Sequence, residues 1–192
     1  MAKKIFILLG HPLHDSMCGR LALAYEKGAM EAGHEIRVAS IGDMKFDPIL
    51  HQGYRAIQEL EPDLKKVQEN ISWADHFVLL YPTWWSAMPA LLKGMFDRMW
   101  LPGFAFHFNK SGIGWHKLLR GKTARVIITM DSWPLASWFL FGDTTNEISR
   151  AILGFSGFSP VRVKKFGPVK TASEDKKNRW EEKVHRWGIK AK

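Results

Sequence analysis

The chain has 192 residues and a formal net charge of +9, with 46% hydrophobic and 24% charged residues. These fractions are typical of a globular protein, and the length fits a single domain over residues 1–192 with a sizeable core. The lone cysteine, Cys18, excludes an internal disulfide and a cysteine-rich metal site.

The first predicted element is the apolar run Lys4–Leu9, which we interpret as a buried strand. Its five consecutive apolar residues are too few for the core of a signal peptide. No apolar run elsewhere approaches the ~20 residues that a spanning helix needs. We therefore predict no membrane span and a cytoplasmic location.

The loop Gly10-His-Pro-Leu-His-Asp-Ser16 leads from this strand into a helix predicted over Ser16–Gly33. Unpaired N–H groups at a helix N-terminus, together with the helix dipole, favour an anion. His11 and Ser16 can add side-chain donors to a phosphate there. The loop lacks Gly-x-Gly-x-x-Gly, so no Rossmann dinucleotide site is indicated. His11 and His14 are too few ligands for zinc, and we predict no metal site.

The second and third strands are predicted at Glu35–Ser40 and His76–Tyr81, with a helix between them at Pro62–Ala74. Pro82-Thr-Trp-Trp85 follows the third strand and leads into a helix over Met88–Trp100. Because open α/β sheets bind ligands at the carboxyl edge of the strands, these tryptophans indicate rigid aromatic surface beside a ligand.

The C-terminal half continues the alternation. Strands are predicted at Thr123–Met130 and Val161–Phe166, and helices at Asn146–Leu153 and Ser173–Trp187. Five strands alternating with five helices predict an α/β fold with a doubly wound parallel sheet of order 2-1-3-4-5 and helices on both faces. The long connections Ile41–Glu61 and Pro102–Lys122 interrupt the pattern, and long ordered loops are often functional.

The last helix, at about 173–187, lies in a strongly basic segment. Residues 162–192 contain eleven Lys or Arg and four Asp or Glu. No nucleic-acid-binding motif accompanies them, so we interpret a solvated basic helix and expect no nucleic-acid partner.

Three segments resemble one family. Tyr81–Arg98 resembles the flavin-ring loop and following helix of the flavodoxin-like NAD(P)H:quinone oxidoreductases. The matching residues are Pro82, Trp85, Pro89, Ala90, Leu92, Lys93, Gly94, Asp97 and Arg98. The His-Pro-x-x-x-Ser spacing of the first loop and the run Ile152–Gly157 resemble the same family. The resemblance implies a flavodoxin-like fold.

The resemblance also implies a flavin site. Its phosphate would lie against His11, Ser16 and the backbone of Met17, and Cys18 stands where the family often has Asn. The flavin ring would lie on Pro82, Thr83, Trp84 and Trp85. Met130 and Asp131 occupy the third flavin loop, which lacks the family's glycines. FMN is slightly favoured, with FAD as the alternative.

The implied activity is transfer of hydride from NAD(P)H to a quinone or similar small acceptor by a ping-pong mechanism. A flavin carries this chemistry itself, so the catalytic residues stay unknown. The alternative is an ancillary subunit of a membrane cation-efflux system. A one-electron flavodoxin is disfavoured, because those carriers are acidic and this chain has a pI near 9.7.

The aromatic residues predict a homodimer. We expect a substrate pocket at Trp133, Phe104 and Phe106, on the ligand side of the sheet, and we interpret Trp133, Trp138, Phe139 and Phe141 either as core or as a lid or dimer wall. The whole set expected at the interface is Trp100, Phe104, Phe106, Phe108, Trp115, Trp133, Trp138 and Phe139. Left exposed, such a patch would exceed what monomers usually tolerate. Lys93 and Arg98 are expected in solvated or interface ion pairs.

Overall fold

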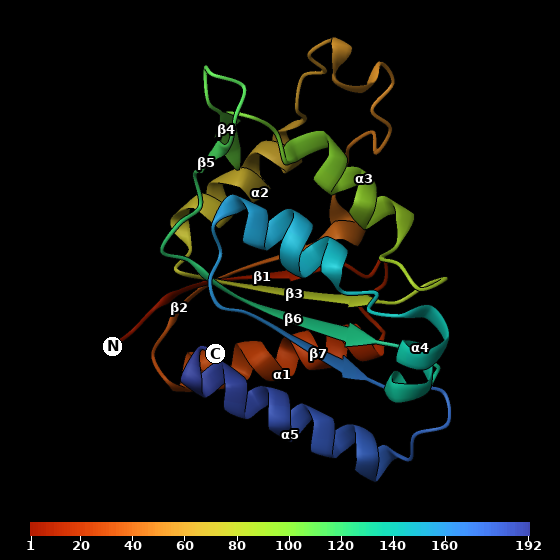
Figure 1. Ribbon diagram of the computed structural model, residues 1–192. Coiled ribbons are helices and arrows are strands. Elements are labelled where there is room, and N and C mark those ends of the chain that lie inside the picture. Colours follow the sequence, from red (N-terminus) through yellow and green to blue (C-terminus); the bar gives the residue numbers. More distant parts are fainter.

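The computed structural model describes residues 1–192 and has a five-stranded parallel sheet at its centre (Figure 1). The strands are β1 Lys4–Leu9, β2 Glu35–Ser40, β3 His76–Pro82, β6 Thr123–Thr129 and β7 Val161–Phe166. Their order across the sheet is β2-β1-β3-β6-β7. The predicted doubly wound sheet is therefore confirmed.

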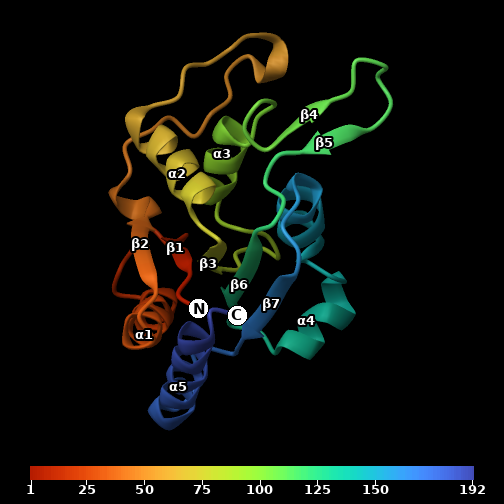
Figure 2. The same ribbon diagram turned by 90° about the vertical axis from the view of Figure 1, so that its left-hand side faces the viewer.

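Helices cover both faces of the sheet. Helices α1 (Met17–Glu31) and α5 (Glu174–Lys190) lie on one face, and α2 (Pro62–Trp73), α3 (Ala90–Met99) and the π-helix η3 (Glu147–Gly154) lie on the other (Figures 1 and 2). None of the helices combines enough length with enough apolar character to cross a bilayer.

The three central strands are buried on both faces, which explains their continuous apolar sequences. Along β3, Phe77 and Leu79 pack into the core beneath α2, α3 and η3, whereas Val78 and Leu80 pack into the core beneath α1 and α5. The sheet therefore separates two cores and holds the ends of its strands rigidly.

Two additions to the minimal fold are absent from the sequence prediction. A hairpin of β4 (Phe106–Phe108) and β5 (Trp115–Lys117) lies within the 102–122 connection, and helix α4 (Pro134–Phe141) follows β6. The 41–61 connection contains the short 3-10 turns η1 (Ile41–Asp43) and η2 (Gly53–Arg55). Helix α4 has no apolar–polar periodicity, so no pattern marked it as a helix.

Several of the aromatic residues that were expected on the ligand side of the sheet lie elsewhere. Trp100 is buried, and Phe104 and Phe106 pack against the core. The β4–β5 hairpin lies at the end of the sheet opposite α4 (Figure 1). The predicted ligand-side position of residues 100–115 is wrong, because α3 runs back from the carboxyl edge before this segment begins.

The aromatic side chains in and before α4 are not part of the core. Trp133, Trp138, Phe139 and Phe141 are all exposed, so the core interpretation of these four is wrong. A core position is excluded because only Ser137 of α4 is buried.

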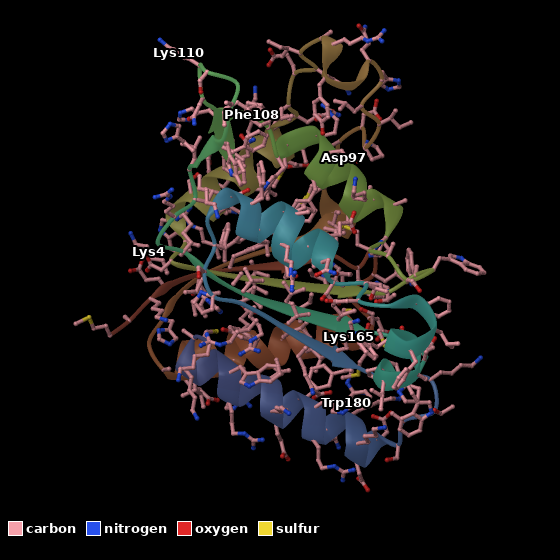
Figure 3. All side chains as sticks on the ribbon, in the orientation of Figure 1. Lys4, Asp97, Phe108, Lys110, Lys165 and Trp180 are labelled. Carbon is pink, nitrogen blue, oxygen red and sulfur yellow. The ribbon has the colours of Figure 1, made fainter.

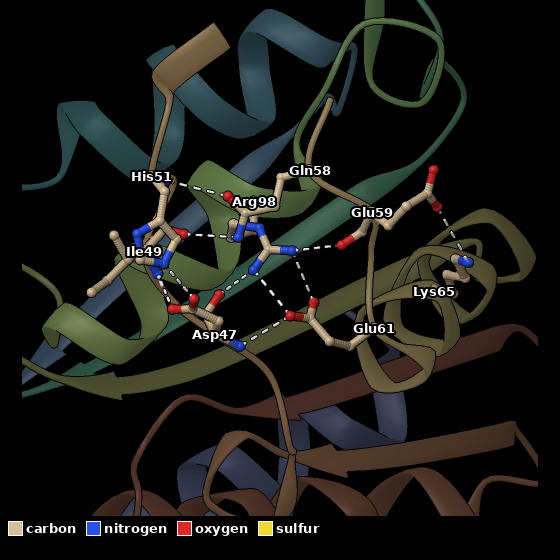
Figure 4. A network of polar contacts seen from close by, with 8 residues as sticks. All are labelled: Asp47, Ile49, His51, Gln58, Glu59, Glu61, Lys65 and Arg98. Atoms are coloured by element: carbon tan, nitrogen blue, oxygen red, sulfur yellow. Dashed lines mark hydrogen bonds and ion pairs between the residues drawn. The ribbon is translucent and has the colours of Figure 1, made fainter. Parts of the chain in front are cut away.

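Arg98 of α3 is buried, which corrects the expectation of a solvated or interface ion pair. Its guanidinium contacts both carboxylate oxygens of Glu61, at 3.0 and 3.1 Å, and donates to the backbone oxygens of Asp47 and Glu59 (Figure 4). Burial acts to raise the pKa of Glu61, but backbone N–H donors and the Arg98 charge outweigh it and lower that pKa. Arg98 thus ties the 47–61 segment to α3.

Replacing Arg98 with Ala should lower the free energy of unfolding by about 3–5 kcal/mol, because Glu61 and two carbonyls lose their buried partner. Lys93→Ala is the matched control on the same helix. Its ion pair with Asp97 is half exposed, with side chains 41% and 40% accessible, so its loss should cost at most about 0.5 kcal/mol. Urea denaturation measures both, and equal losses would contradict the role of Arg98.

Candidate functional site

A cleft of about 180 Å³ lies at the carboxyl edge of the sheet, where the loops after β1, β3 and β6 meet. Nine of the ten residues predicted to contact a cofactor line it: His11, Ser16, Met17, Cys18, Pro82, Thr83, Trp84, Met130 and Asp131. The tenth, Trp85, is fully exposed outside the lining. The fold thus brings three separate sequence segments to one place.

The first loop ends in a capped helix N-terminus. The Gly19 N–H donates to Ser16 Oγ at 3.1 Å, and the Ser16 hydroxyl donates to the Leu13 carbonyl at 3.0 Å. The N–H groups of Met17 and Cys18 make no hydrogen bond within the protein. A Cβ on Gly19 would lie 1.9 Å from the His14 carbonyl, so this tight approach requires glycine. Two backbone donors are therefore free for an anion.

His11 offers a third donor to the cleft. Its Nδ1 accepts from the Leu13 N–H at 2.9 Å, so the neutral ring carries its proton on Nε2. Burial lowers the pKa of His11 despite the opposing effect of this backbone contact. The ring packs edge-on against Trp84, with centroids 6.0 Å apart. His11 can therefore donate a hydrogen bond without carrying charge.

A strained turn follows β3. Trp84 and Ala87 exchange two backbone hydrogen bonds of 3.0 Å, and the residues between them, Trp85 and Ser86, have φ of +50° and +61°. Left-handed backbone in two consecutive non-glycine residues is costly, and such strain is concentrated at ligand sites. The N–H groups of Trp85 and Ser86 have no partner within the protein. The turn beside the cleft thus carries two more backbone N–H groups that are free to donate.

The third loop is tied to the segment after β7. The Met130 N–H donates to the Phe166 carbonyl, and the Lys170 N–H donates to Asp131 Oδ1 at 3.0 Å. Asp131 therefore orders the loop. Thr129 and Val169 also line the cleft and were missed by sequence reasoning. The position of Thr129 at a strand end could have indicated it, whereas nothing in the sequence marks Val169.

Cys18 does not supply a nucleophile. Its Sγ lies 3.1 Å from Thr129 Oγ1 inside the protein. Burial raises the pKa of the Cys18 thiol to about 12, which outweighs the opposing hydrogen bonds to Thr129. The thiol is therefore protonated near neutral pH and joins α1 to β6 beneath the cleft.

The three residues predicted to form the substrate pocket are not brought together. Trp133 follows the third loop, and Lys176 of α5 lies 5.2 Å from its ring centroid. Phe106 instead lines a separate cavity of about 1000 Å³ between α3, η3 and residues 50–58. Phe104 packs edge-on against Trp100, with centroids 5.5 Å apart.

The comparisons with known proteins identify the family. A model described as flavodoxin-like fold matches residues 3–189, so the chain belongs to that family. A Haemophilus influenzae protein named as an uncharacterized NAD(P)H oxidoreductase is 32% identical over 171 residues, covering 85% of this chain and 83% of that protein. The resemblance to NAD(P)H oxidoreductases is therefore confirmed.

Other curated relatives are covered less completely. Escherichia coli YcaK, also named as an uncharacterized NAD(P)H oxidoreductase, is 29% identical over 137 residues, which are 62% of this chain and 66% of that protein. The match to a ribosyldihydronicotinamide dehydrogenase-like protein of Penicillium crustosum spans 58% of that protein. The chain thus covers under two thirds of both relatives.

Solved structures share the fold. An NAD(P)H:quinone oxidoreductase from Methanothermobacter marburgensis superposes with a TM-score of 0.84 at 22% identity, with 100% of each chain covered. An FMN-dependent NADH-azoreductase from Bacillus anthracis, solved in complex with FMN, gives 0.74 at 17% identity, with 97% and 98% covered. At these identities the likeness establishes the fold alone.

Proposed function

We propose that the chain is a flavin-dependent NAD(P)H oxidoreductase that passes hydride to a quinone or similar small acceptor. The observation that carries this proposal is the meeting of three predicted flavin loops at one edge of the sheet. Two backbone N–H groups without partners belong to residues that line the cleft there, and two more lie on the adjoining turn after β3. The names of the relatives support an oxidoreductase. They give no support to the alternative of an ancillary efflux subunit.

The residues at the cleft fit a flavin mononucleotide. The free N–H groups of Met17 and Cys18 and the Nε2–H of His11 suit a phosphate, since all three are donors. The free N–H groups of Trp85 and Ser86 suit the polar edge of a flavin ring. When bound, the flavin supplies the hydride chemistry, whereas the chain binds and orients it. FMN is preferred to FAD because these loops offer no adenosine site.

We further propose a homodimer in which the partner completes the site. The cleft of about 180 Å³ is smaller than typical ligand sites, which enclose about 300–1000 Å³, so a wall is missing. The open apolar cavity beside α3 and η3, which Phe106 lines, is a suitable wall for the partner's cleft. Light scattering should give a dimeric mass, and a monomer with full reductase activity would contradict this arrangement. We also propose a cytoplasmic location.

Replacing Met17 with Pro tests the phosphate position directly. Met17 is the first residue of α1, and the extended backbone of Ser16 (φ −149°, ψ 163°) is compatible with a following proline. The substitution removes one free N–H and keeps the helix, so FMN affinity should fall about tenfold or more. Fluorescence titration measures the affinity.

Met17→Ala is the control for this substitution, because it removes the same side chain and keeps the N–H. It should bind FMN more tightly than Met17→Pro. Equal affinities of the two variants would place the phosphate elsewhere.

The activity is tested by the flavin itself. Purified protein loaded with FMN should lose its absorbance near ~450 nm when NADH or NADPH is added without an acceptor, and should regain it when a quinone follows, because the flavin carries the hydride between two half-reactions. Stopped-flow spectroscopy separates the two half-reactions. A protein that refuses both flavins, or a flavin that neither nicotinamide reduces, would contradict the proposed activity.

A further inference from the structure

The edge strand β7 contributes two basic side chains to the face of the sheet that α5 covers. Val161 and Val163 pack against the core beneath α3 and η3, so the alternating Arg162 and Lys164 point to the opposite face. Both basic side chains are exposed. Because β7 is the last strand of the sheet, no further strand covers them.

Helix α5 turns a row of cationic side chains toward the same edge. Trp180 (Figure 3) and Trp187 lie between the helix and β7, with ring centroids 5.4 and 6.0 Å from that of Phe166. Lys183 Nζ lies 5.7 Å from the Trp187 ring centroid, so this lysine borders the tryptophan side of the helix. Lys190 follows seven residues later on the same side.

Two arginines extend this row. Arg179 and Arg186 precede the two lysines by four residues each, so they lie beside them on the exposed surface of α5. We define the basic flank by its six exposed members: Arg162, Lys164, Arg179, Lys183, Arg186 and Lys190. None of these six side chains forms an ion pair or a hydrogen bond within the chain, because the ion pairs of α5 use other residues. Their charges are therefore free for a partner.

Acidic residues do not neutralise the basic flank. Glu174 and Glu181 contact Arg20 at 2.9 and 2.6 Å, on the side of α5 that faces α1. Asp175 and Glu182 each precede an arginine of the flank by four residues and so lie beside it. Even when both are counted, six basic and two acidic residues leave four positive charges. Strand β7 contains no acidic residue.

The proposed dimer leaves the basic flank uncovered. The flank lies on the face of the sheet opposite α3 and η3, which border the cavity assigned to the dimer contact (Figures 1 and 2). Helix α5 also runs away from the cleft, since the Arg125 guanidinium near the start of β6 donates to the Lys192 carbonyl at 2.8 Å. Lys183 to Lys190 therefore lie toward the amino edge of the sheet.

The chemistry of the basic flank favours phosphate groups over other anionic partners. The centres of protein interfaces are apolar and poor in lysine, whereas all six members of the flank are cationic. Helices that lie in a bilayer surface place an apolar side in the lipid, but the apolar side of α5 is buried, with Val184 in the core beneath α1. Surfaces that bind nucleic acid are polar and strongly positive.

We propose that the basic flank binds the phosphate backbone of double-stranded DNA without reading its sequence. From Arg179 to Lys190 the helix rises about 16 Å at ~1.5 Å per residue. A duplex carries one phosphate charge per ~1.7 Å of its axis, so about ten lie along that length. Single strands are bound by stacking bases on exposed aromatic rings, and Trp180 and Trp187 are half-buried beneath the flank. Duplex RNA is recognised partly through 2′-hydroxyl groups, for which the flank has no uncharged polar side chain.

The sequence alone indicated no nucleic-acid partner, because it contains no binding motif. Contacts to phosphate carry no sequence information, so they require only a positive surface of suitable shape. The isoelectric point near 9.7 agrees with such a surface. Its two halves, β7 and α5, come together only in the folded chain.

Fluorescence polarisation with an end-labelled DNA duplex of about 20 base pairs tests the basic flank in the full-length protein. The wild type should bind at about 50 mM salt, and the logarithm of the association constant should fall linearly with the logarithm of the salt concentration. Lys183→Glu/Lys190→Glu should weaken binding about tenfold or more and reduce the salt slope by about two, since two phosphate contacts are lost. Arg162→Glu/Lys164→Glu should act in the same way from β7.

Lys65→Glu/Lys66→Glu is the matched control, because it changes the net charge equally. These side chains are 57% and 65% exposed on α2, which covers the other face of the sheet. The control should bind the duplex nearly as tightly as the wild type, and circular dichroism verifies the fold of each variant. Equal weakening by the control, or no binding by the wild type, would overturn the proposal. Tighter binding to polyglutamate, phosphatidylglycerol vesicles, single-stranded DNA or duplex RNA would also overturn it.

This binding is independent of the proposed reductase function. The six residues of the basic flank lie outside the cleft, and the polarisation measurement needs neither flavin nor nicotinamide. The two double variants of the flank should therefore lose DNA binding and still reduce quinones at the wild-type rate. A protein that reduces no quinone but binds the duplex through the flank would retain this proposal and lose only the reductase function.

Discussion

The parallel pairing of β1, β3 and β6 is the constraint on which the rest of the structure depends. Leu9 pairs with Leu80, and Pro82 pairs with Thr129, so the three strands end next to one another. Each strand is buried on both faces, and a shift of one residue would exchange the side chains of its two faces between two different cores. The register is therefore strongly specified, and with it the meeting of the three loops. The cleft is therefore a consequence of core packing, which places the ends of the three strands side by side.

The turn at Trp84–Ala87 shows how that rigidity is used. Two left-handed residues destabilise the folded chain by about 1–2 kcal/mol each. The β3–β6 ladder continues to Thr83, whose N–H donates to Thr129 at 2.8 Å, and so anchors the strained turn at its base. The Trp85 and Ser86 N–H groups are held in place before any ligand arrives. Preorganised donors need not be ordered on binding, which favours affinity.

The sequence predicted the sheet order and nine of the eleven residues that line the cleft, because both follow from short-range patterns. Apolar runs such as Phe77–Leu80 identify buried strands, and the residues after a strand must lie at its carboxyl edge. The failures involve features that no local pattern encodes. The sequence around Arg98 is that of a surface helix position, because the residue that pairs with it, Glu61, is distant in sequence. Phe106 follows α3, and only the direction of that helix places it far from its own chain's cleft. Helix α4 lacks periodicity because no side of it is uniformly buried.

The molecule exposes two apolar surfaces of different shape. The cavity beside α3 and η3 is concave, and Lys93, Asp97 and Glu147 contribute polar groups to its lining. A concave surface with fixed polar groups suits a protein partner, since these groups need specific counterparts when water is removed. Helix α4 contains no charged residue, exposes its aromatic side chains and lies at the carboxyl edge of the sheet, where the cleft is found. In the homodimer proposed above, the partner's cavity would meet this same edge. One two-fold contact could then complete the cleft and cover the exposed side chains of α4, since each subunit presents both surfaces.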